Sequence, residues 1–263
     1  MNAQTCKPDL DNANVGNGYV SINTNVNLSR YIKQVYLFFM PFFRSLSGVI
    51  KNDEKEIRIM LGTCLQNVRE REPLVHNITN YVTVNDVANV ILASGASPIM
   101  SDEPQDVEEI TAICGWLNIN IGTLNVRTIE GMLKAGHKAN ELGHVVLLDP
   151  VGAGASSLRT NTAVKLMQEL KLNVIRNGRP EIGRITGTGC QLSGLMTAYL
   201  VANPEQKLEA AAAAVGAMGL AGEIGWSYMQ KGDGNSTYRN RIIDAIYNMT
   251  KEQLDEGAKY EVR

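Results

Sequence analysis

The stretch HVVLLD, residues 144–149, decides the fold class of this chain of 263 residues. It is a short and nearly continuous apolar run, which is typical of a parallel strand buried on both faces. A helical pattern over residues 128–142 ends at Gly143 just before it, and another helical pattern over residues 160–170 follows it. Strands that alternate with helices predict an α/β fold built on a parallel sheet.

The same alternation extends outward in both directions from this strand. Residues 74–80, 96–100 and 116–122 are further strand candidates on its amino-terminal side, and residues 172–176 are a candidate on its carboxyl side. Beyond Gly189 the chain is mostly helical, with an Ala-rich stretch whose small residues permit close helix packing. We therefore expect a helical layer after the last strand.

Two helix starts carry recognisable capping patterns. Asp53 with Glu56 resembles a capping box, followed by apolar residues on one helical face. Thr83 with Asp86 predicts the start of a second helix, which Gly95 ends.

The first 55 residues differ in composition from the remainder. The segment begins rich in Asn and Gly without any period, and its apolar stretch at 31–50 is interrupted by two basic residues and Pro41. A bilayer span needs roughly 20 nearly uncharged residues, so we expect no membrane span and no signal peptide. We predict an irregular extension over 1–55, with a membrane-surface or partner helix as the alternative, and one domain over 56–263.

Charge and cysteine content exclude several function classes. Lys and Arg total 25 against 27 Asp and Glu, a net charge of -2, so the basic footprint of a nucleic-acid binder is missing. The cysteines Cys6, Cys64, Cys114 and Cys190 are widely spaced, which excludes a short-spaced zinc knuckle and a dense disulfide framework. This cysteine usage predicts a reducing, cytoplasmic location.

A glycine loop, ITGTGC at residues 185–190, leads directly into a helical pattern. Unpaired backbone N–H groups at a helix start, together with the helix dipole, bind phosphate or a developing anion. Near such a terminus the pKa of the Cys190 thiol should be lowered, which favours a base or nucleophile. The alternative is that Gly187 and Gly189 only turn the chain tightly and that Cys190 is a small buried apolar residue.

Asp149 ends the central apolar strand, where open α/β sheets place ligand groups. A carboxylate there could hold Mg²⁺ near phosphates, and an ordinary turn residue is the alternative. The following glycine-containing segment, residues 152–157, lacks the third glycine of a dinucleotide fingerprint, and no P-loop motif occurs in the chain.

Several segments, in order, resemble the hydroxyethylthiazole kinase family. The resemblance runs from about residue 56 to residue 263 and is carried by residues 73–86, 95–100, 120–124, 148–154, 174–176, 185–190 and 233–240. It implies a three-layer α/β fold of the ribokinase-like type, with a central, mostly parallel sheet flanked by helices.

The resemblance also implies a reaction: transfer of the ATP γ-phosphate to the hydroxyl of 4-methyl-5-(2-hydroxyethyl)thiazole in thiamine salvage, with Mg²⁺, by a homotrimer whose substrate sites lie between subunits. Cys190 occupies the place where related sugar kinases usually have an aspartate base. The other positions that match family motifs are Met100, Gly187 and Asn77 on the thiazole side, Arg176 at the ATP phosphates and Asp149 in the magnesium region.

One departure from the family pattern is large. Several tens of residues separate the Val-Ile-Arg strand from the glycine loop in the family, whereas here only residues 177–186 lie between them. Ten residues are too few for a parallel crossover with its helix, so the nucleotide-binding part is predicted to be truncated near residue 177. Two hypotheses follow: an active thiazole kinase, or a catalytically impaired thiazole-binding remnant with an incomplete ATP site.

Overall fold

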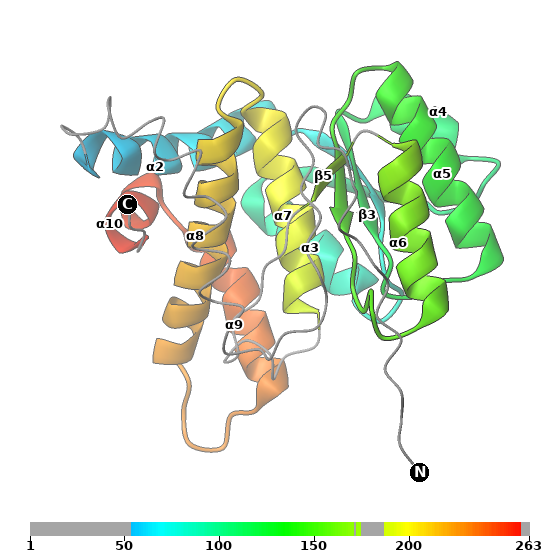
Figure 1. Ribbon diagram of the computed structural model, residues 1–263. Coiled ribbons are helices and arrows are strands. Elements are labelled where there is room, and N and C mark those ends of the chain that lie inside the picture. Colours follow the sequence, from blue (N-terminus) through cyan, green and yellow to red (C-terminus); the bar gives the residue numbers. More distant parts are fainter. Residues whose placement is uncertain (1–53, 171, 175–186, 259–263) are drawn as a thin grey trace, which may run out of the picture. The chain divides into compact units, whose positions relative to one another are not determined.

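The computed structural model describes residues 54–170, 172–174 and 187–258, which fall within one unit, Leu46–Arg263. Its sheet has the strand order β2-β1-β3-β4-β5, and neighbouring strands pair in parallel (Figure 1). The strands are β1 (Leu74–Ile78), β2 (Ser97–Met100), β3 (Trp116–Asn120), β4 (Val146–Asp149) and β5 (Leu172–Val174). A parallel sheet needs helical crossovers, and helices do separate these strands.

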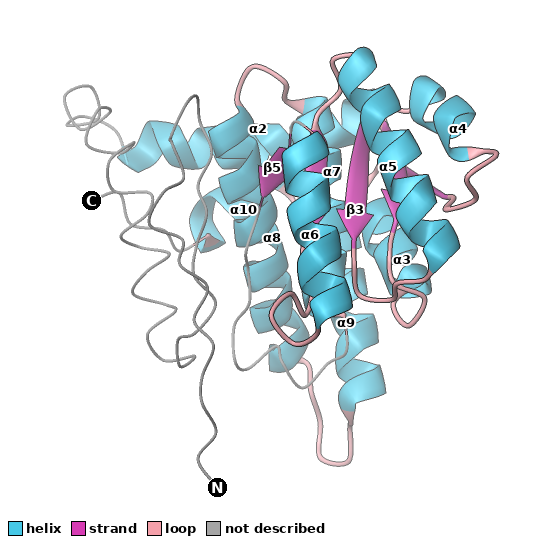
Figure 2. Cartoon of the chain, turned by 45° about the vertical axis from the view of Figure 1, so that its right-hand side comes forward, coloured by secondary structure: helices cyan, strands magenta, loops and turns pink. Residues whose placement is uncertain are grey.

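Helices cover both faces of this sheet (Figures 1 and 2). One face packs against α4 (Val107–Ile113), α5 (Val126–Glu141) and α6 (Ser157–Glu169), and the other packs against α3 (Val84–Ser94) and α7 (Thr188–Ala202). Three further helices pack on α3 or α7: α2 (Glu54–Arg71), α8 (Lys207–Ser227) and α9 (Asn235–Asn248). The last helix, α10 (Lys251–Gly257), packs on α2 and α8. This arrangement confirms the three-layer α/β class.

The helix α8 is long and apolar enough, by length and composition, to cross a membrane. In this fold, however, its small residues, such as Ala213, Ala217 and Ala221, are fully buried. The helix packs against α2, α7 and α9, and the absence of large side chains on this face lets the helices approach closely. Its apolar composition is thus explained by a place in the helical core.

The predicted elements differ from the observed ones mainly at their ends. The strands β1 and β3 stop two residues earlier than the sequence pattern indicated, at Ile78 and Asn120. Thr83 does occupy the N-cap of α3, but its side chain makes no capping hydrogen bond, and Asp86 pairs with Arg239 at 3.4 Å instead. The predicted helix start at Thr83 and its end at Gly95 are therefore confirmed, although the Thr83 side chain does not cap the helix.

Several sequence predictions lie outside the described residues. These are the irregular extension up to residue 53, Asp53 of the first capping box, and the segment 175–186, which contains Arg176 and the beginning of the glycine loop.

Candidate active site

The candidate site lies where β1, β3 and β4 end and α7 begins. Asn80 follows β1, while Asn120 and Asp149 are the last residues of β3 and β4 and are paired in register. Cys190 lies in the first turn of α7, which contacts all three strands. Because parallel strands end at the same edge of a sheet, segments distant in sequence meet here.

The Cys190 thiol is held between two asparagine amides. Asn80 Nδ2 and Asn120 Nδ2 each donate to Cys190 Sγ at 3.2 Å, and the residue is 5% exposed. Burial raises the pKa of this thiol, the charge of Asp149 raises it further, and hydrogen bonds from Thr83, Asn120 and Asn80 lower it; the net direction is upward. The pKa lowering that we expected from the helix terminus was therefore wrong, because burial outweighs the dipole.

Asp149 is linked to the thiol through a shared amide. Asn120 Nδ2 donates to Asp149 Oδ2 at 2.7 Å as well as to the sulfur. Burial raises the pKa of Asp149 to about 6, while hydrogen bonds from Asn120 and Ser193 lower it. A carboxyl with this pKa is mostly ionised at neutral pH and can exchange protons there. Asp149 is thus more than a turn residue.

Glycines allow the loops around the sulfur to approach closely. Gly187, the N-cap of α7, has a φ of 88°, and a Cβ atom there would lie 2.1 Å from Thr83 Cγ2. A Cβ atom at Gly122 would lie 2.6 Å from Asn80 Nδ2. Any side chain at either position would therefore push the loop after β1 away from Cys190.

Gly189 is exposed, and a Cβ atom there would meet no atom of the described residues within 4 Å. These residues leave the mouth of α7 open beside Cys190, and first-turn N–H groups of a helix have no acceptor within the helix. Such a mouth can receive a phosphate or a developing negative charge.

Met100 and Asn77 lie on the same side of the sheet as the thiol but are not equivalent. Met100, the last residue of β2, is partly buried and packs against the core cluster that contains Cys190. Asn77 is 1% exposed, and its Oδ1 accepts from Asn118 Nδ2 at 3.0 Å. Asn118 in turn donates to Ser193 Oγ at 3.5 Å. Asn77 thus belongs to an interior polar row rather than to the open mouth.

Sequence reasoning missed several residues of this site. It did not select Asn80, Asn120, Thr83 or Ser193, although an asparagine immediately after an apolar strand is a usable signal. It also missed Arg159, whose guanidinium donates to the backbone oxygens of Ile121 (2.8 Å), Gly122 (2.7 Å) and Val151 (3.2 Å). This side chain ties together the loops that follow β3 and β4.

Metal binding would depend on a single carboxylate. The described ranges contain no group of three or more His, Cys, Asp or Glu residues able to hold a metal ion. Mg²⁺ is usually held by one or two carboxylates together with waters and substrate phosphates, and the half-buried Asp149 fits that mode.

A family model described as the hydroxyethylthiazole kinase family matches the chain over residues 65–183 and again over residues 171–252. Residues 171–183 fall in both matches.

Relatives and a solved structure agree with this match. The chain is 44% identical over 271 positions to a hydroxyethylthiazole kinase of Clostridium acetobutylicum, with 77% of this chain and 99% of that protein covered. A hydroxyethylthiazole kinase of Clostridium tetani is 34% identical, with 78% and 98% covered. A solved structure of a hydroxyethylthiazole kinase protein from Pyrococcus horikoshii OT3 has a TM-score of 0.69 and 29% identity, with 76% of this chain and 97% of that chain covered.

Proposed function

Because the chain belongs to the hydroxyethylthiazole kinase family, we propose that it transfers the γ-phosphate of ATP to the hydroxyl of 4-methyl-5-(2-hydroxyethyl)thiazole, in the cytoplasm. The observation that carries this proposal is the arrangement at the mouth of α7. An open helix start, a thiol held by two amides and an ionisable carboxylate converge at the strand ends. The products are ADP and the phosphorylated thiazole alcohol.

Phosphoryl transfer asks mainly for positioning and charge neutralisation, because its transition state is loose. The mouth of α7 supplies N–H groups for the transferred phosphoryl group. Asp149 would hold Mg²⁺, which, when bound, would neutralise charge on the phosphates. Arg176 at ATP, and Gly187 and Met100 at the thiazole, keep the roles that the family motif implies for them, whereas the buried Asn77 supports the strand ends from the interior.

Cys190 is the proposed acceptor of the alcohol proton. The oxygen of the alcohol forms a bond to phosphorus while its proton passes to the thiolate sulfur and the bond from phosphorus to ADP breaks. Because burial raises the pKa of the thiol, only a small fraction is thiolate at neutral pH. A loose transition state tolerates this, since the proton leaves late and a strong base is not essential.

The test is ADP release by the purified full chain with ATP, Mg²⁺ and the thiazole alcohol. The expected result is turnover that depends on the thiazole and is reduced in Cys190→Ala. A variant at an exposed cation far from the site, Lys165→Ala on α6, is a matched control for handling and folding. Absence of thiazole-stimulated ADP release from well-folded protein would refute the kinase proposal.

A second candidate is a thiazole-binding protein without phosphoryl transfer. Two observations favour it: residues 171–183 fall in both matches with the family model, and β5 is the last strand at its edge of the sheet among the described residues. Titration calorimetry distinguishes the two: heat on adding the thiazole alcohol, with no ADP formed, supports this second function.

The assembly is proposed to be a homotrimer, and light scattering after size exclusion would measure its mass.

A further inference from the structure

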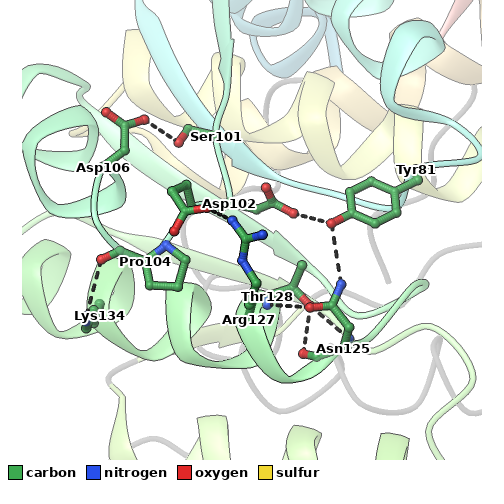
Figure 3. Close-up of polar contacts among 10 residues, drawn as sticks. Tyr81, Ser101, Asp102, Pro104, Asp106, Asn125, Arg127, Thr128 and Lys134 are labelled. Carbon is green, nitrogen blue, oxygen red and sulfur yellow. Dashed lines mark hydrogen bonds and ion pairs between the residues drawn. The ribbon is translucent and has the colours of Figure 1, made fainter.

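Three loops at the carboxyl edge of the sheet meet at the phenol of Tyr81 (Figure 3). Tyr81 lies between β1 and α3, Asp102 between β2 and α4, and Asn125 between β3 and α5. Tyr81 donates its hydroxyl to Asp102 Oδ2 at 2.5 Å, and Asn125 Nδ2 donates to the same phenol oxygen at 3.5 Å. Nothing in the proposed reaction uses this contact.

The loop that carries Asp102 is firmly anchored to α5. A Cβ atom at Gly131 would lie 2.5 Å from the backbone oxygen of Asp102, so helix and loop are in close contact there. Lys134 Nζ donates to the Pro104 oxygen at 3.3 Å. Two further contacts hold the same loop, Ser101 Oγ to Asp106 Oδ2 at 2.6 Å and the ion pair of Arg127 with Glu103. Asp102 is therefore presented from a fixed frame.

The loop that carries Tyr81 has a buried side and an exposed side. Asn80 and Thr83 are buried and act on the Cys190 thiol, whereas Tyr81 and Val82 are 55% and 71% exposed. On the exposed side, the Tyr81 backbone N–H donates to Thr123 Oγ1 at 3.1 Å. The hydrogen bond from the Tyr81 phenol to Asp102 then links this loop to the anchored loop that follows Met100.

We propose that Tyr81 is a positioning residue: its hydrogen bond to Asp102 latches the loop of residues 79–83 over Cys190 and so keeps the Asn80 amide on the sulfur. The latch also fixes the spacing between Asn80 and Met100, which lies two residues before Asp102. The importance of this spacing for thiazole binding rests on the proposed function, whereas the shielding of Cys190 does not.

The direct test measures how fast iodoacetamide alkylates Cys190, by mass spectrometry of the peptide, at fixed pH in the full chain. Removal of an exposed hydrogen bond to a charged acceptor is expected to raise the population of the open loop about threefold to tenfold. The rate at which iodoacetamide alkylates Cys190 should therefore be higher by that factor in Tyr81→Phe. Tyr247→Phe, at an exposed tyrosine on α9, is the matched control and should not change the rate. Cys64 and Cys114, both buried, report global unfolding in the same samples.

A double variant separates a latch from a general loss of stability. Asp102→Ala should speed the alkylation of Cys190 as Tyr81→Phe does, and the double variant should be no faster than the faster single variant, because both remove one interaction. The proposal would be overturned if the effects of the two single variants on the alkylation rate multiplied in the double variant. It would also be overturned if Tyr81→Phe left the alkylation rate of Cys190 unchanged, or if Cys64 and Cys114 were accelerated equally.

Kinetics then give the readout that depends on the proposed function. If the wild-type chain is a kinase, Tyr81→Phe should raise KM for the thiazole alcohol about threefold to tenfold while kcat stays within about twofold, because the contact orders the loop rather than the reacting atoms. A wild-type chain without ADP release refutes the kinase function alone, since the alkylation rates still decide the latch.

Discussion

The two faces of the sheet bury their side chains in different ways. On the face toward α4 and α5 the strands present mainly apolar residues, and the polar exception, the buried His76, bonds to Thr111 of α4 at 2.9 Å. The apolar residues are Ile78, Leu117, Ile119, Val146 and Leu148, all at most 1% exposed. On the face toward α7 the strands begin apolar, with Val75, Trp116 and Leu147, and end polar, with Asn77, Asn118, Asn120 and Asp149. One face thus serves stability alone, while the other combines stability with a polar site.

The difference explains why the site is polar and yet buried. Burial of a polar group is costly unless it is hydrogen-bonded, and the amides on the α7 face do bond to one another, to Cys190 and to Asp149. An electrostatic cost falls on Asp149, because burial raises its pKa. We expect substitutions on the α5 face to change the free energy of unfolding and those on the α7 face to change activity.

The largest expected effect is on the α5 face. Leu148→Ala should lower the free energy of unfolding by about 3–4 kcal/mol, because it leaves a cavity in a fully buried layer. Urea unfolding followed by circular dichroism measures it, with Leu142→Ala at a 41% exposed position as the control. In the fraction that remains folded, kcat should change by less than about twofold. A stable Leu148→Ala protein with strongly reduced kcat would contradict the division between the faces.

Next in size is the pH dependence of stability that Asp149 introduces. Its pKa is about 6 in the folded chain against 3.8 for an unperturbed group, so the folded state binds the proton more tightly than the unfolded state. The protonated carboxyl therefore contributes to the free energy of unfolding below about pH 4. This contribution, about 3 kcal/mol, is lost as the pH rises through about 6.

Asp149→Asn should remove that loss. The difference in unfolding free energy between variant and wild type should therefore grow between about pH 4 and pH 6 and stay level above that range. Urea titrations at a series of pH values measure it. A difference independent of pH would mean that the carboxyl is not raised in pKa.

Asn120 is the donor shared by Cys190 and Asp149, so its loss should affect activity more than stability. Asn120→Ala should lower kcat/KM about 100-fold, the size seen when one preorganised donor is removed from a reaction centre. Initial rates of ADP release measure this, with Asn89→Ala as a control at an asparagine of α3 that bonds only within its helix. A change of less than about threefold would exclude Asn120 from the site.

The smallest expected effect on the α7 face is that of Cys190 itself. Because its raised pKa keeps most of the thiol protonated, Cys190→Ala should lower kcat only about tenfold near neutral pH. In wild type the rate should rise with pH as thiolate forms, and the variant should lose that rise. If kcat depended on pH in the same way in both proteins, Cys190 would not be the proton acceptor.

Much of the fold follows from local sequence patterns. The run at 144–149 predicted a buried parallel strand, and β4 lies at Val146–Asp149 with Leu147 and Leu148 fully buried. The helical pattern at 128–142 corresponds to α5, which differs by two residues at its start. Strand ends were less predictable, because a polar residue such as Asn80 continues the alternating sequence pattern after β1 has ended at Ile78.

The site was only partly predictable. Gly187, Cys190 and Asp149 were selected because a glycine loop, a helix start and a strand end are local features, and they do converge. The direction in which the pKa of Cys190 moves could not be found in this way, since it depends on burial by the loop after β1 and by the end of β3, which are distant in sequence. The same holds for Thr83, which is the N-cap of α3 but whose buried side chain makes no capping hydrogen bond.

The sequence by itself determined the α/β alternation and the family, because the motifs that carry both consist of residues close together along the chain. Only the tertiary structure decided which asparagines reach the thiol, which way its pKa moves and how Tyr81 joins two loops. These outcomes depend on distances between strand ends and on the exclusion of water, and neither exists until the parallel strands have been brought side by side.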